Sequence, residues 1–185
     1  MGKREDILEA TLHLINKEGL QSVTFSKILK RANVGSSTVY HYFKDKEQLV
    51  NELFNIVRIH RTEEVLKKYD ASQTIYERIK TLLWNMAKYA LNFPKELIFL
   101  ENYSYSPYIA EEVRNAQDPS VLEVISIIRE GQQQGMIKEM DQIILIQLLY
   151  GMITSVIKGY LAGEYELERA QIQQVIELCW KTIKV

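Results

Sequence analysis

A dense group of hydrogen-bonding side chains lies near the N-terminus, within barely two helical turns. Its members carry hydroxyl, imidazole or ammonium groups: Ser36, Ser37, Thr38, Tyr40, His41 and Lys44. Such groups suit phosphate oxygens and the base edges of a major groove, and the positive end of a helix N-terminus adds to this. Lys46 is placed to anchor a further phosphate, and Thr24 is another candidate contact. The chemistry indicated is recognition of duplex DNA.

Several of these residues also have a simpler interpretation as structural side chains. The helical phase of Tyr40 points outward, whereas Tyr42 and Phe43 are better explained as core aromatics. His41 has no second ligand at metal-binding spacing, which favours a contact with DNA. His60 and Glu64 stand four residues apart, but no third ligand is visible, so a solvated face or a polar contact is the better interpretation.

Two short helices must position this group, and the spacing predicts them over 25–32 and 36–43. Thr24 can cap the first helix, and Asn33 tolerates the left-handed conformation that a sharp turn needs. Helices this short pack steeply through few apolar residues. The inner faces are predicted to be formed by Ile28, Ala32, Val34, Val39 and either Tyr42 or Phe43.

The rest of the chain also shows helical patterns, and no segment alternates as a strand. Apolar residues recur on one side of 4–18, which Gly19 ends, and Asp45 to Gln48 resembles a capping box at the start of a long helix. Pro94 and Asp118-Pro119 suit the starts of two helices, and Asp141 suits a cap. We therefore expect an all-α protein with further helices over 46–68, 72–92, a short stretch from 94, 119–135, 143–162 and 168–184.

Composition fits a soluble protein of a reducing cytoplasm. The 185 residues include one cysteine, Cys179, so an internal disulfide is excluded, and the helical face around it indicates a buried thiol. No apolar stretch follows the N-terminal basic pair, which argues against a signal peptide. The most apolar segment, 143–162, contains Gln147 and Lys158 and is interpreted as a buried helix rather than a membrane span.

The net charge of −1 is unevenly distributed. Residues 1–68 hold 12 basic and 9 acidic side chains, a net +3, and residues 69–185 hold 11 and 15, a net −4. A basic N-terminal part on an acidic body is expected when one end faces phosphates. The difference is modest and agrees with DNA recognition.

The segment from Val39 to Leu49, Val-Tyr-His-Tyr-Phe-Lys-Asp-Lys-Glu-Gln-Leu, resembles the recognition helix and following helix of the TetR family of bacterial transcriptional regulators. Ile7 to Gly19 and Val23-Thr24-Phe25 match the opening helices, so the resemblance covers about residues 4–50. Departures from the family pattern stand at Leu29, Asn33, Gly35 and Ser37. The resemblance implies an N-terminal three-helix helix-turn-helix domain over 1–47, linked by helix 46–68 to a helical ligand-binding and dimerisation domain over 48–185.

The resemblance also implies that the last two helices form a four-helix dimer interface with a second copy. Small residues recur every four positions from Gly151 to Gly163, which fits either an intrachain crossing or a subunit interface. The candidate interface residues are Gly151, Ser155, Ile172, Val175, Ile176, Cys179 and Ile183.

A small-molecule pocket in the middle helices is a further implication of the resemblance. Aromatic residues there could line it, although core packing is the better explanation for any one of them. Basic residues are sparse in this region, which favours a mostly apolar ligand. The candidates are Trp84, Tyr89, Phe99, Tyr103, Tyr105 and Tyr150.

These observations predict a homodimeric repressor that binds a pseudo-palindromic operator and is released by a small molecule. An activator, a regulator without a ligand and a helical protein-interaction module are the alternatives. The sequence shows no Gly-rich phosphate loop, metal cluster or nucleophile with a base, so we expect no enzyme activity, cofactor or metal. The expected partners are duplex DNA, a small effector and a second copy, with no membrane.

Overall fold

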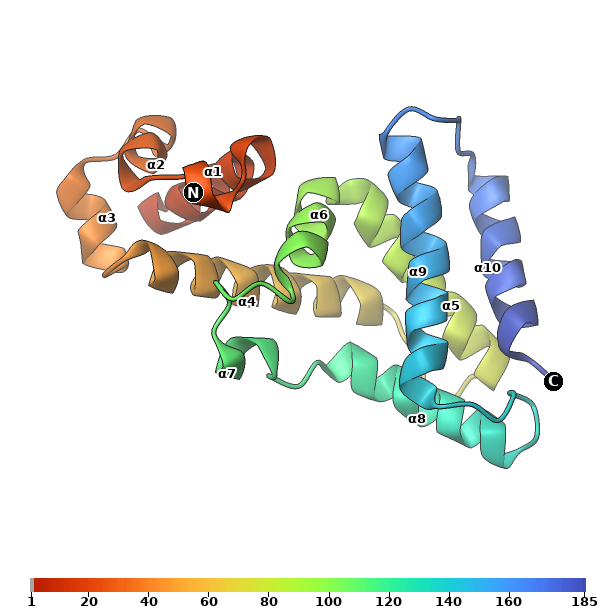
Figure 1. Cartoon of the computed structure of the whole chain (residues 1–185). Helices are drawn as coiled ribbons and strands as arrows, with labels where there is room; N and C mark the ends of the chain where they lie inside the picture. Colours follow the sequence, from red (N-terminus) through yellow and green to blue (C-terminus); the bar gives the residue numbers. More distant parts are fainter. Residues whose placement is uncertain (1) are drawn as a thin grey trace. The chain divides into compact units, whose positions relative to one another are not determined.

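The chain is all-α, as predicted, and the computed structural model describes residues 2–185 (Figure 1). Within that range the one β feature is an isolated bridge between Ile137 and Lys184. The elements are α1 (Lys3–Glu18), the 3₁₀ turn η1 (Leu20–Ser22), α2 (Phe25–Ala32), α3 (Ser36–Tyr42), α4 (Lys46–Leu66), α5 (Ile75–Asn92), α6 (Pro94–Tyr103), α7 (Glu111–Arg114), α8 (Pro119–Gln133), α9 (Gln142–Leu161) and α10 (Arg169–Ile183).

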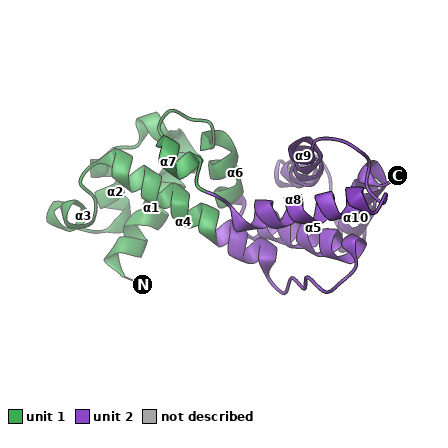
Figure 2. Cartoon of the chain, turned by 90° about the horizontal axis from the view of Figure 1, so that it is seen from below, with its two compact units in different colours: residues 1–59, 95–116 green, residues 60–94, 117–185 purple. Residues whose placement is uncertain are grey.

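The helices form two compact units (Figure 2). Unit 1 comprises Met1–Ile59 and Lys95–Ala116, and unit 2 comprises His60–Pro94 and Gln117–Val185. This division differs from the boundary at 47/48 expected from the sequence. Residues 48–59 of α4 and the whole segment 95–116 pack with the N-terminal helices, because their apolar side chains belong to the same core.

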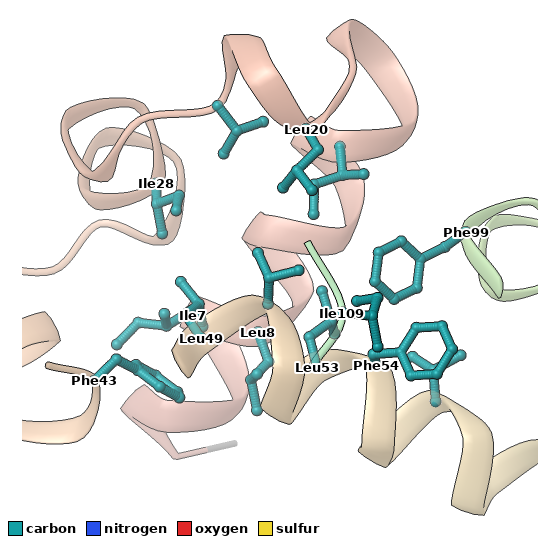
Figure 3. Close-up of a cluster of buried hydrophobic side chains, with 14 of the residues drawn as sticks. Ile7, Leu8, Leu20, Ile28, Phe43, Leu49, Leu53, Phe54, Phe99 and Ile109 are labelled. Carbon is teal, nitrogen blue, oxygen red and sulfur yellow. The ribbon is translucent and has the colours of Figure 1, made fainter. Parts of the chain in front are cut away.

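The core of unit 1 collects side chains from α1, α2, α3, α4, α6 and the segment before α7 (Figure 3). Phe54 of α4 meets Phe99 of α6 edge to face, with ring centroids 6.0 Å apart. Each such side chain contributes about 1.5–3 kcal/mol when fully buried. The members labelled in Figure 3 are Ile7, Leu8, Leu20, Ile28, Phe43, Leu49, Leu53, Phe54, Phe99 and Ile109.

Unit 2 is built around α5, which α8, α9 and α10 contact. Helix α5 is buried over most of its turns, including Ile79, Leu82, Leu83 and Met86. Leu149 and Ile153 are buried on α9, and Ile176 on α10. A central helix with an apolar surface this wide requires neighbours on several sides.

Local capping signals predicted some helix starts and missed one. Asp118 accepts from the amide of Ser120, and Asp141 accepts from the amides of Ile143 and Ile144, as expected from their positions. Helix α5, in contrast, starts after Thr74 rather than at Ser72. Ser72 instead donates to the carboxylate of Asp70, a local bond that stabilises the loop and not the helix.

The prediction that residues 143–162 form a buried helix was only partly right. Helix α9 is long and apolar enough to cross a membrane by length and composition, yet 33% of the relevant window is buried within the chain. Leu145, Leu149 and Ile153 face the core, whereas Ile144 and Leu148 are exposed on the opposite side. One face of α9 thus serves the core of unit 2, and the other is an apolar surface.

Candidate nucleic-acid interface

Helices α2 and α3 form a helix-turn-helix with the geometry expected from the sequence. The hydroxyl of Thr24 accepts from the amide of Lys27 at 3.4 Å and caps α2. Asn33 ends this helix in the left-handed conformation, with φ 52° and ψ 49°. Ile28 and Val39 are fully buried between the two helices and the core. The pair is therefore fixed by its cap, its turn and its apolar contacts.

The structure resolves which aromatic residue completes the inner face of α3. Phe43, directly after the helix, is fully buried, whereas Tyr42 is partly exposed. The Tyr42 ring lies edge to face with His41, at a centroid distance of 5.0 Å. The inner position thus belongs to Phe43.

The outer face of α3 carries the predicted polar side chains. Ser36, Ser37 and His41 are exposed, and Thr38 is half-buried. Tyr40 is 61% exposed, and its ring rests edge to face on Phe25 of α2 at 5.3 Å between centroids. Because one side of the ring is held by Phe25, the phenol is directed outward by packing.

The connection from α3 to α4 contains a modified form of the expected capping box. The carboxylate of Asp45 accepts from the amide of Gln48 at 2.8 Å. The side chain of Gln48 reaches back to the amide of Lys44 at 2.7 Å, one residue earlier than in a standard box. Both amides are satisfied, and the Lys44 side chain is left exposed beside α3.

Lys46 is engaged inside unit 1, which the sequence did not predict. Its ammonium group donates to the carbonyl of Leu20 at 2.6 Å. Burial lowers the pKa of this lysine from its ordinary value. Lys46 is half-buried, and its ammonium group has one donor engaged within unit 1.

Lys27 is a residue that sequence reasoning missed. It lies in the first turn of α2, and its ammonium group contacts the carbonyl of Ser22 and the carboxylate of Glu18, each at 2.8 Å. Its position three residues after the Thr24 cap was visible in the sequence and could have singled it out. Like Lys46, it fixes the turn that precedes α2.

The departures from the family pattern are accommodated locally. Leu29 is half-buried and packs against the core of unit 1. Gly35 is the N-cap residue of α3 and has φ −75°, a conformation that any residue adopts. No side chain caps the start of α3.

Three of the six aromatic candidates for a ligand pocket belong to each unit. In unit 1, Phe99 is core, and Tyr103 accepts a hydrogen bond from the Leu20 amide at 3.0 Å. Tyr105 is 82% exposed and so lines no pocket within that unit. In unit 2, Trp84 lies under the Arg169 guanidinium at 5.2 Å, Tyr89 is fully buried beside Phe93, and Tyr150 is half-buried.

Most of the predicted dimer-interface residues of α10 face the chain's own core, which corrects that interpretation. Four of them are buried within unit 2: Ile172, Ile176, Cys179 and Ile183. Burial also raises the pKa of the Cys179 thiol to about 11. The remaining candidates lie on the outer side, with Ser155 exposed and Val175 and Gly151 half-exposed.

His60 and Glu64, the pair on α4, each contact other residues of unit 2, and the His60 ring is packed against aromatic side chains. The His60 ring lies edge to face with Phe93 at 4.5 Å and with Tyr89 at 6.1 Å. Glu64 pairs with Lys67 at 2.7 Å. Over residues 2–185, no group of three or more metal-binding side chains comes together.

Two family models match consecutive parts of this chain. The model described as bacterial regulatory proteins of the tetR family matches residues 7–53. The model described as the tetracyclin repressor-like C-terminal domain matches residues 53–185. The second match alone covers more than half of the chain, including the region where the sequence showed no family signal.

Whole-chain relatives agree with these matches. An uncharacterised HTH-type transcriptional regulator of Haemophilus influenzae is 24% identical over 97% of this chain and 95% of its own length. The structure of a TetR family transcription regulator from Marinobacter aquaeolei covers 98% of this chain and 95% of its own, with 22% identity and a TM-score of 0.90.

A third similar protein carries a more specific name. The fatty acid degradation regulator FadR from Bacillus halodurans covers 98% of this chain and 94% of its own, with 19% identity and a TM-score of 0.75. At this identity the likeness concerns the fold. The helix-turn-helix, the all-helical C-terminal part and both family models together show that this chain is a transcriptional regulator of the TetR family, and not an enzyme.

Proposed function

We propose that this regulator binds a pseudo-palindromic operator as a homodimer, represses transcription there, and is released by a small, mostly apolar ligand. The observation that carries the DNA-binding part is the outer face of α3. Exposed Ser36, Ser37, Tyr40 and His41 stand on a short helix whose inner face is locked by buried side chains. A fixed helix with outward hydrogen-bonding groups matches the dimensions and chemistry of a major groove.

Each predicted contact has a distinct task in this proposal. The α3 side chains face base edges and phosphates, and Thr24 and Lys44 contact the flanking DNA backbone. Lys46 donates to a phosphate through the N–H groups of its ammonium that do not bond to the Leu20 carbonyl. An ammonium group has three donors, so one internal bond leaves two. Phosphate contacts position the helix, and base contacts give it specificity.

A selection experiment tests DNA binding and identifies the operator at the same time. Sheared genomic DNA from the source organism is incubated with the purified regulator, and retained fragments are sequenced. We expect the wild type and the control variant Tyr105→Ala to retain the same few palindromic fragments, and Tyr40→Ala to retain none of them. Recovery of the same unspecific mixture by all three proteins, after removal of any co-purified ligand, would support the interaction-module alternative instead.

The dimer that we propose uses the exposed face of α9 and α10, which lie side by side in unit 2 (Figure 1). Ile144 and Leu178 are each 53% exposed, and Leu148 is 44% exposed. A Cβ atom added to Gly151 on the same face of α9 would meet nothing within 4 Å. A glycine costs a helix interior about 1 kcal/mol, and here nothing within the chain requires it.

Contact with a second copy would explain the glycine at position 151, because small residues let two helix backbones approach closely. An isologous twofold contact would cover Ile144, Leu148 and Leu178 of both subunits at once. Such a dimer presents two recognition helices at a separation of about 34–36 Å, or one helical turn of DNA. The apolar outer face of α9 would then be a subunit interface in the cytoplasm and not a membrane contact.

Release by a ligand requires that the ligand bind the DNA-free conformation more tightly. Basic residues are sparse among the middle helices, so we propose a mostly apolar compound. Fatty acids are the first compounds to test, because one similar structure is named as a regulator of fatty acid degradation. Addition of the active compound should dissociate the regulator from a selected fragment, and the gene beside that fragment should become transcribed.

A further inference from the structure

We infer that Tyr103 and Lys46 are positioning residues for DNA recognition, because they hold the Leu20 peptide from both sides and thereby set the start of α2. The inference rests on the proposed DNA-binding function. It assigns to Tyr103 a role in the DNA-binding unit instead of a ligand pocket. It also explains why Lys46 is half-buried.

The contacts converge on one residue of the turn between α1 and α2. The Leu20 amide donates to the phenol oxygen of Tyr103 at 3.0 Å. The Leu20 carbonyl accepts from the Lys46 ammonium at 2.6 Å and from the Val23 amide at 3.3 Å. The Leu20 side chain is buried in the core of unit 1. Side chain, amide and carbonyl of this residue are thus all fixed.

Tyr103 is held firmly in place by the core. Its ring lies 5.4 Å from that of Phe99, which in turn packs against Phe54 on α4. The chain after Tyr103 is bonded to α4 as well. Asn51 donates to the carbonyl of Tyr108 at 3.2 Å and accepts from the amide of Ala110 at 2.7 Å. The phenol therefore approaches Leu20 from a rigid support.

The fixed turn leads directly into the DNA-binding elements. A few residues after Leu20, the chain reaches Thr24 and the first turn of α2, where Lys27 holds the carbonyl of Ser22. Lys46 belongs to the first turn of α4, immediately after α3 and its connection. The Leu20 peptide consequently joins the start of α2 to the start of α4, and α3 lies between them in the sequence.

Loss of the Tyr103 hydroxyl leaves the Leu20 amide without its side-chain hydrogen-bond acceptor. An amide within a packed unit that lacks a partner is costly, so the turn would shift toward solvent or another acceptor. That shift moves Thr24 and the Lys46 ammonium together.

The first test compares Tyr103→Phe with the control Tyr105→Phe, whose phenol is on the exposed residue of the same segment. Both variants are titrated with a fragment selected by the wild type, at a temperature where each is folded. We expect Tyr103→Phe to bind about 3- to 10-fold more weakly, as loss of one hydrogen bond allows, and Tyr105→Phe to match the wild type. Hydrogen exchange at the Leu20 amide should accelerate in Tyr103→Phe alone.

A double-mutant cycle separates positioning from a purely structural effect. Lys46→Met removes the ammonium and keeps an unbranched side chain. If both residues act through the Leu20 peptide, their effects overlap. The double variant with Tyr103→Phe and Lys46→Met will then lose less DNA affinity than the product of the fold losses of the two single variants. Independent losses that multiply, or wild-type affinity in Tyr103→Phe, would overturn the inference. A wild-type protein that selects no fragment would instead refute the proposed function.

Discussion

At the scale of single residues, Asn33 shows how a side chain can specify a fold. It is one of two residues other than glycine, within the part that the structure describes, that have a positive φ. Asparagine tolerates this conformation better than most residues, which made the turn between α2 and α3 predictable. The asparagine at this position thus predicted the sharp turn between α2 and α3.

Substitution at Asn33 tests this explanation. We expect Asn33→Ala to lower the free energy of unfolding by about 1 kcal/mol, because a Cβ-bearing residue without a local hydrogen-bonding group is strained there. Asn33→Gly should leave it unchanged or raise it slightly. Urea unfolding of the three proteins measures the difference. Equal stability of Asn33→Ala and Asn33→Gly would show that the left-handed turn is unimportant.

Tyr40 allows the contribution of its hydroxyl to be separated from that of its ring. Tyr40→Phe keeps the edge contact with Phe25 and removes the outward donor. We expect about a tenfold loss of operator affinity in Tyr40→Phe and a larger loss in Tyr40→Ala, at unchanged dimerisation. Fluorescence anisotropy titration checks this. If Tyr40→Phe binds like the wild type, only the ring of Tyr40 contributes.

Tyr103 and Lys46 make contacts that the sequence did not predict. The family resemblance made Tyr103 a candidate for a ligand pocket, and Lys46 was expected at a phosphate, but both side chains bond to Leu20 within unit 1. These partners lie 83 and 26 residues away in the chain. Neither periodicity nor spacing indicates such a pairing, because it depends on how α6 and α4 pack around the turn.

At the scale of elements, the starts of helices were predicted where a single side chain caps its own helix. Thr24, Asp118 and Asp141 did so. The start of α5 was missed because Ser72 and Thr74 are both acceptable caps, and the loop bond to Asp70 decides between them. A capping side chain determines where a helix starts only when no other local hydrogen bond competes for it.

Asp118 links α8 to α4 within unit 2 and gives a prediction about pH. Burial alone would raise the pKa of this carboxyl, but the charge of Arg61 and hydrogen bonds from Ser120, Arg61 and Thr62 hold it below its usual value. The folded state therefore prefers the ionised form. Its stabilising effect is complete above the unfolded pKa of about 3.9 and disappears as the pH falls below that value.

The variant Asp118→Asn should accordingly be less stable than the wild type by about 1–3 kcal/mol at pH 7, since it leaves Arg61 without its carboxylate, while the amide oxygen of asparagine can keep the cap. Between pH 5 and pH 8 the difference should stay constant, and below about pH 4 it should shrink. Urea unfolding at several pH values measures it. A difference that grows on acidification would contradict the assignment.

At the scale of the whole molecule, the all-α architecture was predictable, and the division into units was not. Regular apolar spacing and the lack of strand alternation indicated helices throughout. However, the segment 95–116 joins unit 1 through Phe99 and Ile109, which are far in sequence from the helices they contact. The apolar face of α10 was likewise assigned to a second copy, although it fills the core of its own unit. A pattern shows that a face is buried but does not show by what.

The dimer proposal yields a prediction for the outer face of α9 and α10. Leu178→Arg should weaken dimerisation by about 100-fold or more, because it places an unpaired charge in the interface. The control Leu122→Arg changes a residue of similar exposure on α8 and should remain dimeric. Sedimentation velocity over a range of concentrations measures both. A dimeric Leu178→Arg would place the interface elsewhere.

The central claim is that α3 recognises a particular DNA sequence. Its most direct test is the ratio of two affinities at one salt concentration: for a selected palindromic fragment, and for a fragment of the same length and composition in scrambled order. We predict that the wild type prefers the selected fragment by at least about 10³-fold, and that Tyr40→Ala loses most of this preference. Equal affinity of the wild type for both fragments would contradict the account.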